Sequence, residues 1–508
     1  MKSVNKKLLI FLPVFIGGIL SIVANNVYVY RNDNVFNQFS TCDSTVISHK
    51  YHDAGVSLCN DRDTIPVEVI DSIVIRRIDI PVLRFTFPDH PELSWVKDKE
   101  NYISAVLDID GNGMTESADS LQLSVKGRGN SSWWFPKKPM RLKFSKKISI
   151  CGFAKAKSYV LLADCVDPTL MHNATALWLA QQMGVDYVNS FMPCHVYVNG
   201  KYAGAYLLTE KISINKASVD IDDSKGVLIE MSNEYDEEYK FHSALYEMPV
   251  MIKDPDLSEI AAEYPDYLAG FSMSEEPKEP EGAEGMEEPE EAEEAEETED
   301  DGGEEVTAED ILRAWEYDFN QAESKAALLE GAEAFDMLSF VNYMLVNDLV
   351  LNNEIGHPKS CYIYKEGLGL EYKYKFGPVW DFDLSFNAVA KNGTQEVNIP
   401  YDGYLWLNPL FEKLVNSPEF MPLFQERWQY FMDEVYPSLF EWMDSYNAMI
   451  EPLAKMNAMR WPQPHSNQWI TAKYNTYDNK TRLAEIKNWL HKRIRHIYKA
   501  TREGVFSK

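Results

Sequence analysis

The segment SVKGRGNSSWWFPKKPMRLKF, residues 124–144, joins two strand-like patterns through a glycine-rich loop. Both of its ends alternate apolar and polar residues, which is the period of a strand with one buried face. Gly127 and Gly129, with the following Asn and two Ser residues, form a loop whose small side chains let backbone amides point at an anion. No Gly-Lys-Ser/Thr triplet opens a helix after this loop, so it is not a Walker A motif. The segment instead predicts a β-hairpin whose loop covers a ligand.

The same segment carries a positive charge that the rest of the chain does not. The 508 residues have a net charge of −30. Residues 275–305 hold eighteen acidic residues and one lysine, and the rest of the chain carries −13. A local reversal of sign predicts a phosphate-facing surface, with an ordinary basic hairpin as the alternative. The overall acidity argues against a nucleic-acid partner. The basic residues of the segment are Lys126, Arg128, Lys137, Lys138, Arg141 and Lys143.

Outward from the hairpin, the strand pattern continues on both sides. The runs IPVLRFTF, YISAVLDI and SYVLLADC are short, alternating and rich in β-branched and aromatic residues, so residues 80–165 predict an antiparallel sheet. Residues 167–184 have helical periodicity and end at a glycine, which predicts a helix. The Asn199-Gly200 dipeptide between two further runs predicts a tight hairpin turn.

The second half of the chain has a different pattern. Residues 308–315, 325–348 and most of 408–505 place leucine and aromatic residues at spacings of three to four, which is typical of helices. A strand-rich first half packed with a helix-rich second half predicts an α+β fold.

The N-terminus has the layout of an export signal. Three lysines within residues 2–7 precede an uncharged apolar run, Leu8–Ala24. The run is also close to the length of a membrane anchor, so an uncleaved anchor stays open. We therefore expect the body of the protein outside the cytoplasm, as a secreted, periplasmic or cell-surface protein, with membrane contact only through this segment. Six cysteines in an exported chain permit disulfides, with Cys42 and Cys59 the favoured pair and buried free thiols the alternative for the others.

Composition divides the chain into five parts. Residues 1–24 are the signal peptide or anchor, and residues 25–75 are a polar, irregular leader or a small strand-bearing cap. Residues 76–271 form the strand-rich part and residues 306–508 the helical part. Between them, residues 272–305 are too acidic to bury a core and are predicted to be a disordered insertion.

Two acidic motifs in the second half point to cation chemistry. Asp381 and Asp383 follow the alternating run that begins at residue 372, and side chains at i and i+2 of a strand share a face. A bound Mg²⁺, which pairs one or two carboxylates with substrate phosphates, would offset the cost of burying both acids. Asp348 and Asn353 have the Asp-x-x-x-x-Asn spacing with which protein kinases place a catalytic Asp and a metal-binding Asn. A capped helix C-terminus is the alternative explanation.

Together these motifs resemble one family. KGRGNSSWWFPKKPMRLKF, YVLLADCVDPTLMHNATALWLAQQMG, VYVNGKYAGAYLLTEKI, NDLVLNNE and WDFDLSF occur in the order of the successive motifs of the CotH kinase family, across about residues 80–505. The resemblance implies an atypical protein-kinase-like fold with two lobes, a strand-rich N-lobe at residues 76–271 and a helix-rich C-lobe at residues 306–508. It also implies transfer of the ATP γ-phosphate to Ser or Thr hydroxyls of a protein substrate with Mg²⁺ or Mn²⁺.

The resemblance also implies roles for particular residues. Asp348 would be the catalytic base or the residue that orients the acceptor hydroxyl, and Asp381 the main metal ligand. Asn353 and Asp383 would support the metal. Lys143, with Lys126 and Arg128 nearby, would contact the phosphates, and Glu210 would pair with that lysine. Trp133 or Trp380 would stack on adenine. Asp-Phe-Asp in place of Asp-Phe-Gly, and the missing His-Arg-Asp triplet, depart from ordinary kinases.

Other functions stay open on the sequence alone. A non-catalytic surface or envelope protein would keep the fold without turnover. A glycoside hydrolase using Asp381 and a second acid would leave the basic hairpin without a role. Residues 108–119 nearly fit a calcium loop, but a hairpin turn explains their Asp, Asn and Gly residues equally well.

Overall fold

The computed structural model describes residues 80–272 apart from 94, 95 and 168, residues 306–386 apart from 357, residues 408–462, and residues 479–503. It also describes the backbone of six strands between residues 26 and 76. Helices and strands are mixed throughout, which confirms the predicted α+β class. The predicted signal (residues 1–24), Cys42 and nearly all of the acidic insertion lie outside the described residues. No helix in the described part of the chain is both long and apolar enough to cross a membrane.

The first described segment, for which the sequence allowed a leader or a strand-bearing cap, contains strands. They form two three-stranded sheets, ordered β2-β1-β6 and β3-β4-β5. Their bounds are β1 Asn26–Arg31, β2 Asn34–Ser40, β3 Ser48–His52, β4 Gly55–Cys59, β5 Thr64–Pro66 and β6 Ser72–Arg76.

The main strand-rich region is a closed barrel and not an open sheet. Its strand order is β10-β11-β13-β12-β7-β8-β9, and β9 pairs with β10 to close it. All pairs are antiparallel except β7 with β12. Leucine, valine and phenylalanine side chains from alternate positions fill the barrel. The strands are β7 Val82–Thr86, β8 Ile103–Asp110, β9 Ala118–Gly127, β10 Met140–Ile148, β11 Ala156–Leu162, β12 Phe191–Val198 and β13 Lys201–Glu210.

Turn chemistry sets the barrel hairpins. Asn199 and Gly200 have φ values of 46° and 75°, as a two-residue turn between paired Val198 and Lys201 requires. The possible calcium loop is the β8–β9 connection. There the Asp108 carboxylate accepts a hydrogen bond from the Ser120 amide at 2.7 Å, and Asn112 donates to the Ile80 carbonyl at 2.6 Å. The hairpin explanation of residues 108–119 therefore accounts for these side chains.

A second sheet is built from strands that come before and after the acidic insertion in the sequence. Its order is β15-β16-β14-β17-β18, so β14, before the insertion, pairs with β17, after it. The first structural unit consequently ends before β14, whereas the sequence divided the chain at residues 272–305. The strands are β14 Val227–Met231, β15 Lys240–His242, β16 Pro249–Asp254, β17 Cys361–Lys365 and β18 Lys375–Phe376.

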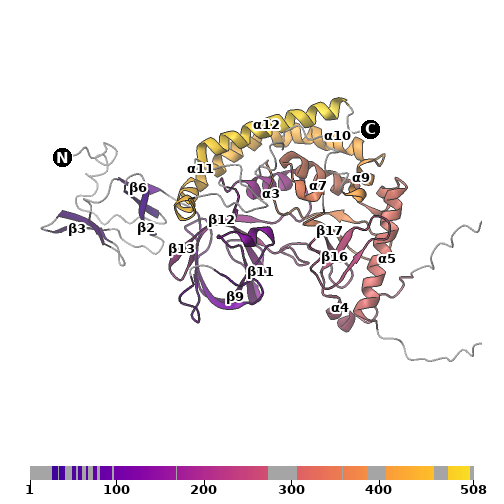
Figure 1. The fold of residues 1–508 in the computed structure, drawn as a ribbon, viewed down its shortest axis with the longest axis horizontal. Coiled ribbons are helices and arrows are strands. Elements are labelled where there is room, and N and C mark those ends of the chain that lie inside the picture. The colour runs from indigo at the N-terminus through magenta and orange to yellow at the C-terminus, as the bar shows by residue number, and fades with distance from the viewer. Residues whose placement is uncertain are drawn as a thin grey trace, which may run out of the picture.

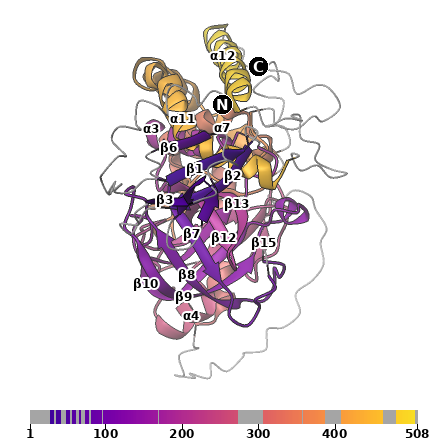
Figure 2. The same ribbon diagram turned by 90° about the vertical axis from the view of Figure 1, so that its left-hand side faces the viewer.

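Helices cover this sheet and extend over the barrel. Figure 1 shows the barrel and the second sheet next to each other beneath a helical layer that contains α3, α7, α10, α11 and α12. Figure 2, turned by 90°, shows α11 and α12 above the barrel strands. The helices are α3 His172–Met183, α4 Leu257–Glu263, α5 Ala308–Ala327, α6 Gly331–Ala334, α7 Met337–Val350, α9 Pro409–Val415, α10 Phe420–Tyr430, the π-helix η4 Phe431–Val435, α11 Tyr436–Arg460 and α12 Asn479–Glu503.

Helix α3 links the two bodies. It lies in the chain between β11 and β12 of the barrel, yet its apolar side chains belong to the core of the second sheet and the helices. Gly184, at φ 71°, ends it as the sequence predicted. The four cysteines whose side chains are described, Cys151, Cys165, Cys194 and Cys361, are buried free thiols.

Candidate active site

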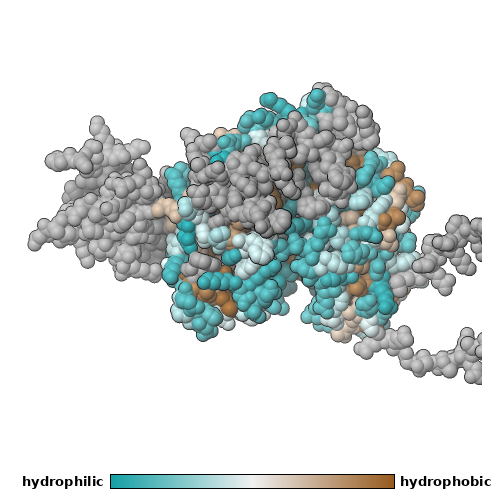
Figure 3. Space-filling view, in the orientation of Figure 1, coloured by the Kyte–Doolittle hydropathy of each residue, from teal (hydrophilic) through white to brown (hydrophobic). Residues whose placement is uncertain are grey.

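A cleft lies between the barrel and the second sheet. Its volume is about 540 Å³. One wall comes from β9, β10, β11 and the glycine loop, and the other from β14, β16, β17 and residues 380–384. Hydrophilic residues predominate on the described surface of both bodies in Figure 3. The cleft is therefore the place where the basic hairpin can face the acidic motif.

Four of the predicted phosphate- and metal-binding residues line this cleft. Lys126 and Arg128 come from the barrel wall, and Asp381 and Asp383 come from the segment after β18. Gly127 and Gly129 line it as well. The opposition of cations from the first half of the chain and acids from the second half, which the sequence predicted, is present.

The acids reach the cleft by a different route from the one predicted. β18 spans only Lys375–Phe376, so Asp381 and Asp383 do not sit on one face of a strand, and that expectation was wrong. Asp381 has φ 63°, a left-handed conformation that Asp tolerates better than most residues. Both carboxylates face the cavity because the chain turns there.

Three predicted residues do not line the cleft, and one has no described side chain. Lys143 is exposed on β10, with its ammonium 5.6 Å from the Tyr102 ring centre. Glu210 is buried at the end of β13, and burial raises the pKa of its carboxyl to about 7. Asp348 is buried on α7, where it forms an ion pair with Arg493 of α12. Asn353 begins the short 3₁₀ helix η3, Asn353–Ile355, but its side chain is outside the described part.

The acidic wall contains a group of three neighbouring carboxylates in addition to Glu230, Glu234 and Asp236. Glu354 joins Asp381 and Asp383 in the cavity lining. Burial, followed by the charge of Asp381, raises the pKa of Glu354 well above its ordinary value. Burial, followed by Asp164 and Asp381, does the same to the pKa of Asp383. Lys359 is the nearest counter-charge, with its ammonium 3.9 Å from Glu354 Oε1 and 3.1 Å from Glu234.

The barrel wall is cationic and partly desolvated. Arg141 and Lys211 line the cleft beside Lys126 and Arg128. Burial, and then the neighbouring Arg141, lower the pKa of Lys211 to about 8. The guanidinium of Arg128 lies 5.5 Å from the Trp380 ring centre, so it reaches across to the acidic segment. An anion in the cleft would relieve the repulsion within this wall.

The two glycines of the hairpin loop are each required for a different structural reason. A Cβ added at Gly127 would lie 2.1 Å from the Trp133 ring, so glycine is needed for this close packing. Gly129 has φ 86°, where other residues are strained. Lys138 lies 4.7 Å from the Trp133 ring centre. Trp133 is therefore a packing residue, whereas Trp380 lines the cleft.

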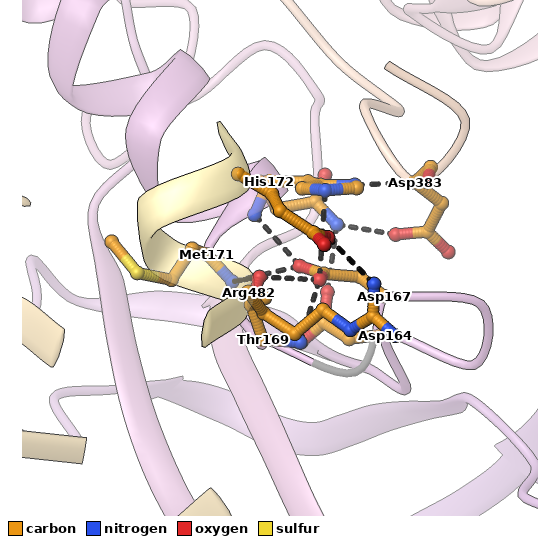
Figure 4. A network of polar contacts seen from close by, with 9 residues as sticks. Asp164, Asp167, Thr169, Met171, His172, Asp383 and Arg482 are labelled. Atoms are coloured by element: carbon orange, nitrogen blue, oxygen red, sulfur yellow. Dashed lines mark hydrogen bonds and ion pairs between the residues drawn. The ribbon is translucent and has the colours of Figure 1, made fainter. Parts of the chain in front are cut away.

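A polar network supports the acidic wall from behind. Asn173, in the first turn of α3, donates to the carboxylates of both Asp164 and Asp383, which are labelled in Figure 4. Its Oδ1 accepts from the Phe382 amide at 3.0 Å. Burial and the neighbouring Asp167 raise the pKa of Asp164 to about 7. A second pair of acids, Asp164 and Asp167, therefore lies buried behind the acids of the cleft.

Lys137 ends close to this network. Its side chain is 1% exposed, and its ammonium lies 4.9 Å from the Tyr206 ring centre without a hydrogen-bond partner among the described residues. Burial lowers the pKa of Lys137, while Cys165, Asp164 and Asp383 raise it. Lys137 therefore supplies part of the positive charge that offsets the buried acids.

The donor set of the cleft fits a hard divalent cation bound together with phosphate. The described residues contain no group of three or more His, Cys, Asp or Glu side chains already gathered as metal ligands. Mg²⁺, however, commonly takes one or two carboxylates and completes its sphere with phosphate oxygens and water. Glu354 lines the cleft, and its Oε2 is buried with no hydrogen-bond partner in the described part of the chain, so it is a further candidate acceptor at the site.

Comparison with known proteins agrees with the geometry. Residues 125–497 match the CotH kinase protein family. The chain belongs to this family. The matched region contains the glycine hairpin, α3 and both acidic motifs, so it spans both walls of the cleft. A search of curated proteins finds no match. Membership makes the chain a kinase-like protein and suggests phosphotransfer with ATP and a divalent cation as the family's general chemistry.

Sequence reasoning missed several residues that line the cleft or lie behind its acidic wall. Glu354 lay within the quoted motif, but the kinase spacing drew attention to Asp348 instead. Lys211 follows Glu210 directly, and Asn173 lay in the segment assigned to a helix. Lys359 and Asp164 had no pattern of their own. An acidic residue between an apolar helix and a strand was the one available signal for Glu354.

Proposed function

We propose that this protein is an extracytoplasmic kinase that transfers the γ-phosphate of ATP to Ser or Thr hydroxyls of a protein, using Mg²⁺ or Mn²⁺. The observation that carries the proposal is the single cleft in which basic residues of the barrel face Glu354, Asp381 and Asp383. Catalysis in such a site consists mainly of positioning and charge stabilisation.

The barrel wall is the phosphate-binding side of this proposal. Lys126, Arg128 and Lys211 carry the charges that would contact the triphosphate. Residues 129–132 of the glycine loop also line the cleft, so their backbone amides are candidates for further phosphate contacts. Lys143, which the resemblance favoured, is exposed outside the cleft, so we assign its role to Lys126 and Arg128.

The acidic wall is the cation-binding side. Asp381 and Asp383 are the residues that would hold the metal, with Asn353 as a further candidate from the sequence. A divalent cation there would neutralise charge on the β- and γ-phosphates. Glu354, whose Oε2 lacks a partner among the described residues, is our candidate for orienting the acceptor hydroxyl and taking its proton. This role replaces the one that the resemblance gave to Asp348.

A transfer assay tests the proposal. Purified protein with labelled ATP, Mg²⁺ or Mn²⁺ and a generic acceptor protein should incorporate label into acid-stable phosphoserine or phosphothreonine. Glu354→Gln should reduce incorporation by about 10²-fold or more, since a positioned acid or base contributes 10²–10⁴. The absence of any label on wild type, with ATP still bound, would support the non-catalytic surface protein instead.

Two lysines of the barrel make a matched pair for the phosphate side. Lys126 and Lys143 both lie over the Tyr102 ring, at 5.1 and 5.6 Å, but only Lys126 lines the cleft. Lys126→Gln should raise the KM for ATP, whereas Lys143→Gln should leave it unchanged. Equal effects of the two substitutions would contradict the assignment.

Extracytoplasmic action rests on the N-terminal sequence alone. Fusing residues 1–40 to a reporter that is active only after export should give active reporter. Replacing Leu8–Ala24 with a polar linker of equal length should abolish it.

A further inference from the structure

Helix α3 reaches the acidic segment through side chains in its first turn, of which Asn173 makes the most hydrogen bonds to that segment. Asn173 is 2% exposed and uses its whole amide. Its Nδ2 donates to Asp383 and, at 2.8 Å, to Asp164, while its Oδ1 accepts from the backbone amide of Phe382. Figure 4 shows the two aspartates approaching the start of α3 from different parts of the chain. One residue thus holds both the backbone and a side chain of the acidic segment.

The start of α3 is itself fixed. The Asp167 carboxylate accepts hydrogen bonds from the amides of Thr169, Met171 and His172, at 2.7 to 2.8 Å. His172 Nδ1 lies 3.3 Å from the Asp383 carbonyl oxygen, and the His172 ring stacks on Phe386 at 5.0 Å. The helix turn therefore contacts the acidic segment on both sides of Asp383.

The acidic segment has little regular structure of its own to hold it. β18 ends at Phe376, and Asp381 is in a left-handed conformation. The carboxylates of Asp164 and Asp383 both accept hydrogen bonds from the Asn173 amide, so two groups of like charge lie close together there. A donor that bridges the two carboxylates offsets their repulsion.

We propose that Asn173 is a positioning residue that sets Asp383 and the backbone of Phe382, and thereby Asp381, in the arrangement that binds the divalent cation. This inference rests on the proposed function for the identity of that cation. The inference also gives α3 a role, which is to hold the Asp-Phe-Asp segment in one position. This segment lacks the glycine of the Asp-Phe-Gly motif, and its fixed partner α3 lies between two barrel strands in the chain.

Hydrogen exchange and metal binding test the proposal without any turnover. In Asn173→Ala, residue-resolved exchange of the Phe382 amide should accelerate by about 10-fold or more, because its acceptor is gone. Mn²⁺ binding, followed by electron paramagnetic resonance on the full chain, should weaken by about 10-fold, the loss typical of residues that orient metal ligands. Unchanged Phe382 exchange, or faster exchange with unchanged Mn²⁺ affinity, would overturn the proposal.

Asn342 provides the matched control. It is also a buried helical asparagine, and it bonds with Arg427 and the Gly184 carbonyl, outside the cleft lining. Asn342→Ala should cost similar stability without changing Phe382 exchange or Mn²⁺ affinity. If Asn173→Ala does not fold, Asn173→Gln keeps the amide but displaces it, and should weaken Mn²⁺ binding in the same direction. Unchanged Mn²⁺ affinity in Asn173→Gln would then overturn the proposal.

The transfer assay separates this inference from the function on which it rests. In an active enzyme, Asn173→Ala should raise the metal concentration for half-maximal rate more than it lowers kcat at saturating metal. A merely structural role would lower the active fraction and leave that concentration unchanged. A wild type that binds Mn²⁺ with a protected Phe382 amide but transfers no phosphate would contradict the proposed function and support the positioning role.

Discussion

Two groups of acids in this protein differ in how their charge is balanced. Asp348 and Asp318 each pair with one buried cation, Arg493 and Lys365, and Tyr374 donates a further hydrogen bond to Asp318. Glu354, Asp381 and Asp383 instead face a cavity, and burial raises the pKa of Glu354 and Asp383. An acid with a buried cation of its own stabilises the fold, whereas acids that share a cavity are available to a ligand. The partner of an acid, more than its burial, therefore indicates whether the acid stabilises the fold or binds a ligand.

The largest expected effect is on the cavity acids. Asp381→Asn should lower phosphate transfer by about 10³-fold, since it removes charge that holds the metal at the reacting phosphate. Its midpoint of urea unfolding should stay the same or rise, because repulsion among the acids decreases. Transfer rates and denaturation curves on the same preparation check this. A loss of stability in proportion to the loss of activity would remove the contrast between the two groups.

The paired acids should behave in the opposite way. Asp348→Ala should lower the free energy of unfolding by about 3–5 kcal/mol, because Arg493 is left charged and buried. Asp348→Ala combined with Arg493→Met should recover part of the loss. Mn²⁺ affinity should be that of wild type in every variant that folds. Weaker Mn²⁺ binding in the double variant would return Asp348 to the catalytic role implied by the resemblance.

Glu210 sharpens the comparison, since it is a buried acid outside both groups. Burial raises the pKa of its carboxyl from 4.5 to about 7. Because the folded state holds the proton more tightly, this contribution to stability is fully present below about pH 4.5 and is lost as the pH rises through 7. The free energy of unfolding of wild type should therefore fall as the pH rises, and Glu210→Gln should remove up to about 2–3 kcal/mol of this fall. Thermal unfolding from pH 4.5 to 8 measures it, and parallel curves for variant and wild type would count against the raised pKa.

The smallest effect concerns metal binding and pH. Glu354 and Asp383 must lose their protons to face a cation, and their raised pKa values mean that protons compete with it. Mn²⁺ affinity should therefore increase about 10-fold between pH 5 and pH 8, and Glu354→Gln should flatten this dependence. Calorimetric titrations in buffers of different ionisation enthalpy would detect the released protons. An affinity that does not change with pH would mean that the acids are already ionised.

How far the sequence predicted the site depended on the range of the interactions. Lys126, Arg128, Asp381 and Asp383 were found because local motifs carry them. Glu210 and Lys143 were chosen by analogy with the order of elements in ordinary kinases, and neither lines the cleft once the barrel has closed. Asn173 could not be found, since its partners are Asp164 and, 210 residues away, Asp383.

The sequence by itself determined the α+β class, most strands of the barrel, the α3 helix with its glycine end, the Asn199-Gly200 turn and the opposition of basic and acidic motifs. These features follow from periodicity, turn chemistry and local charge, which act over a few residues. Only the tertiary structure decided that the sheet closes into a barrel, that β14 pairs with β17 across the acidic insertion, and which buried acids have a cation beside them. Those outcomes depend on contacts between distant segments, because pairing and burial become defined only when the whole chain packs.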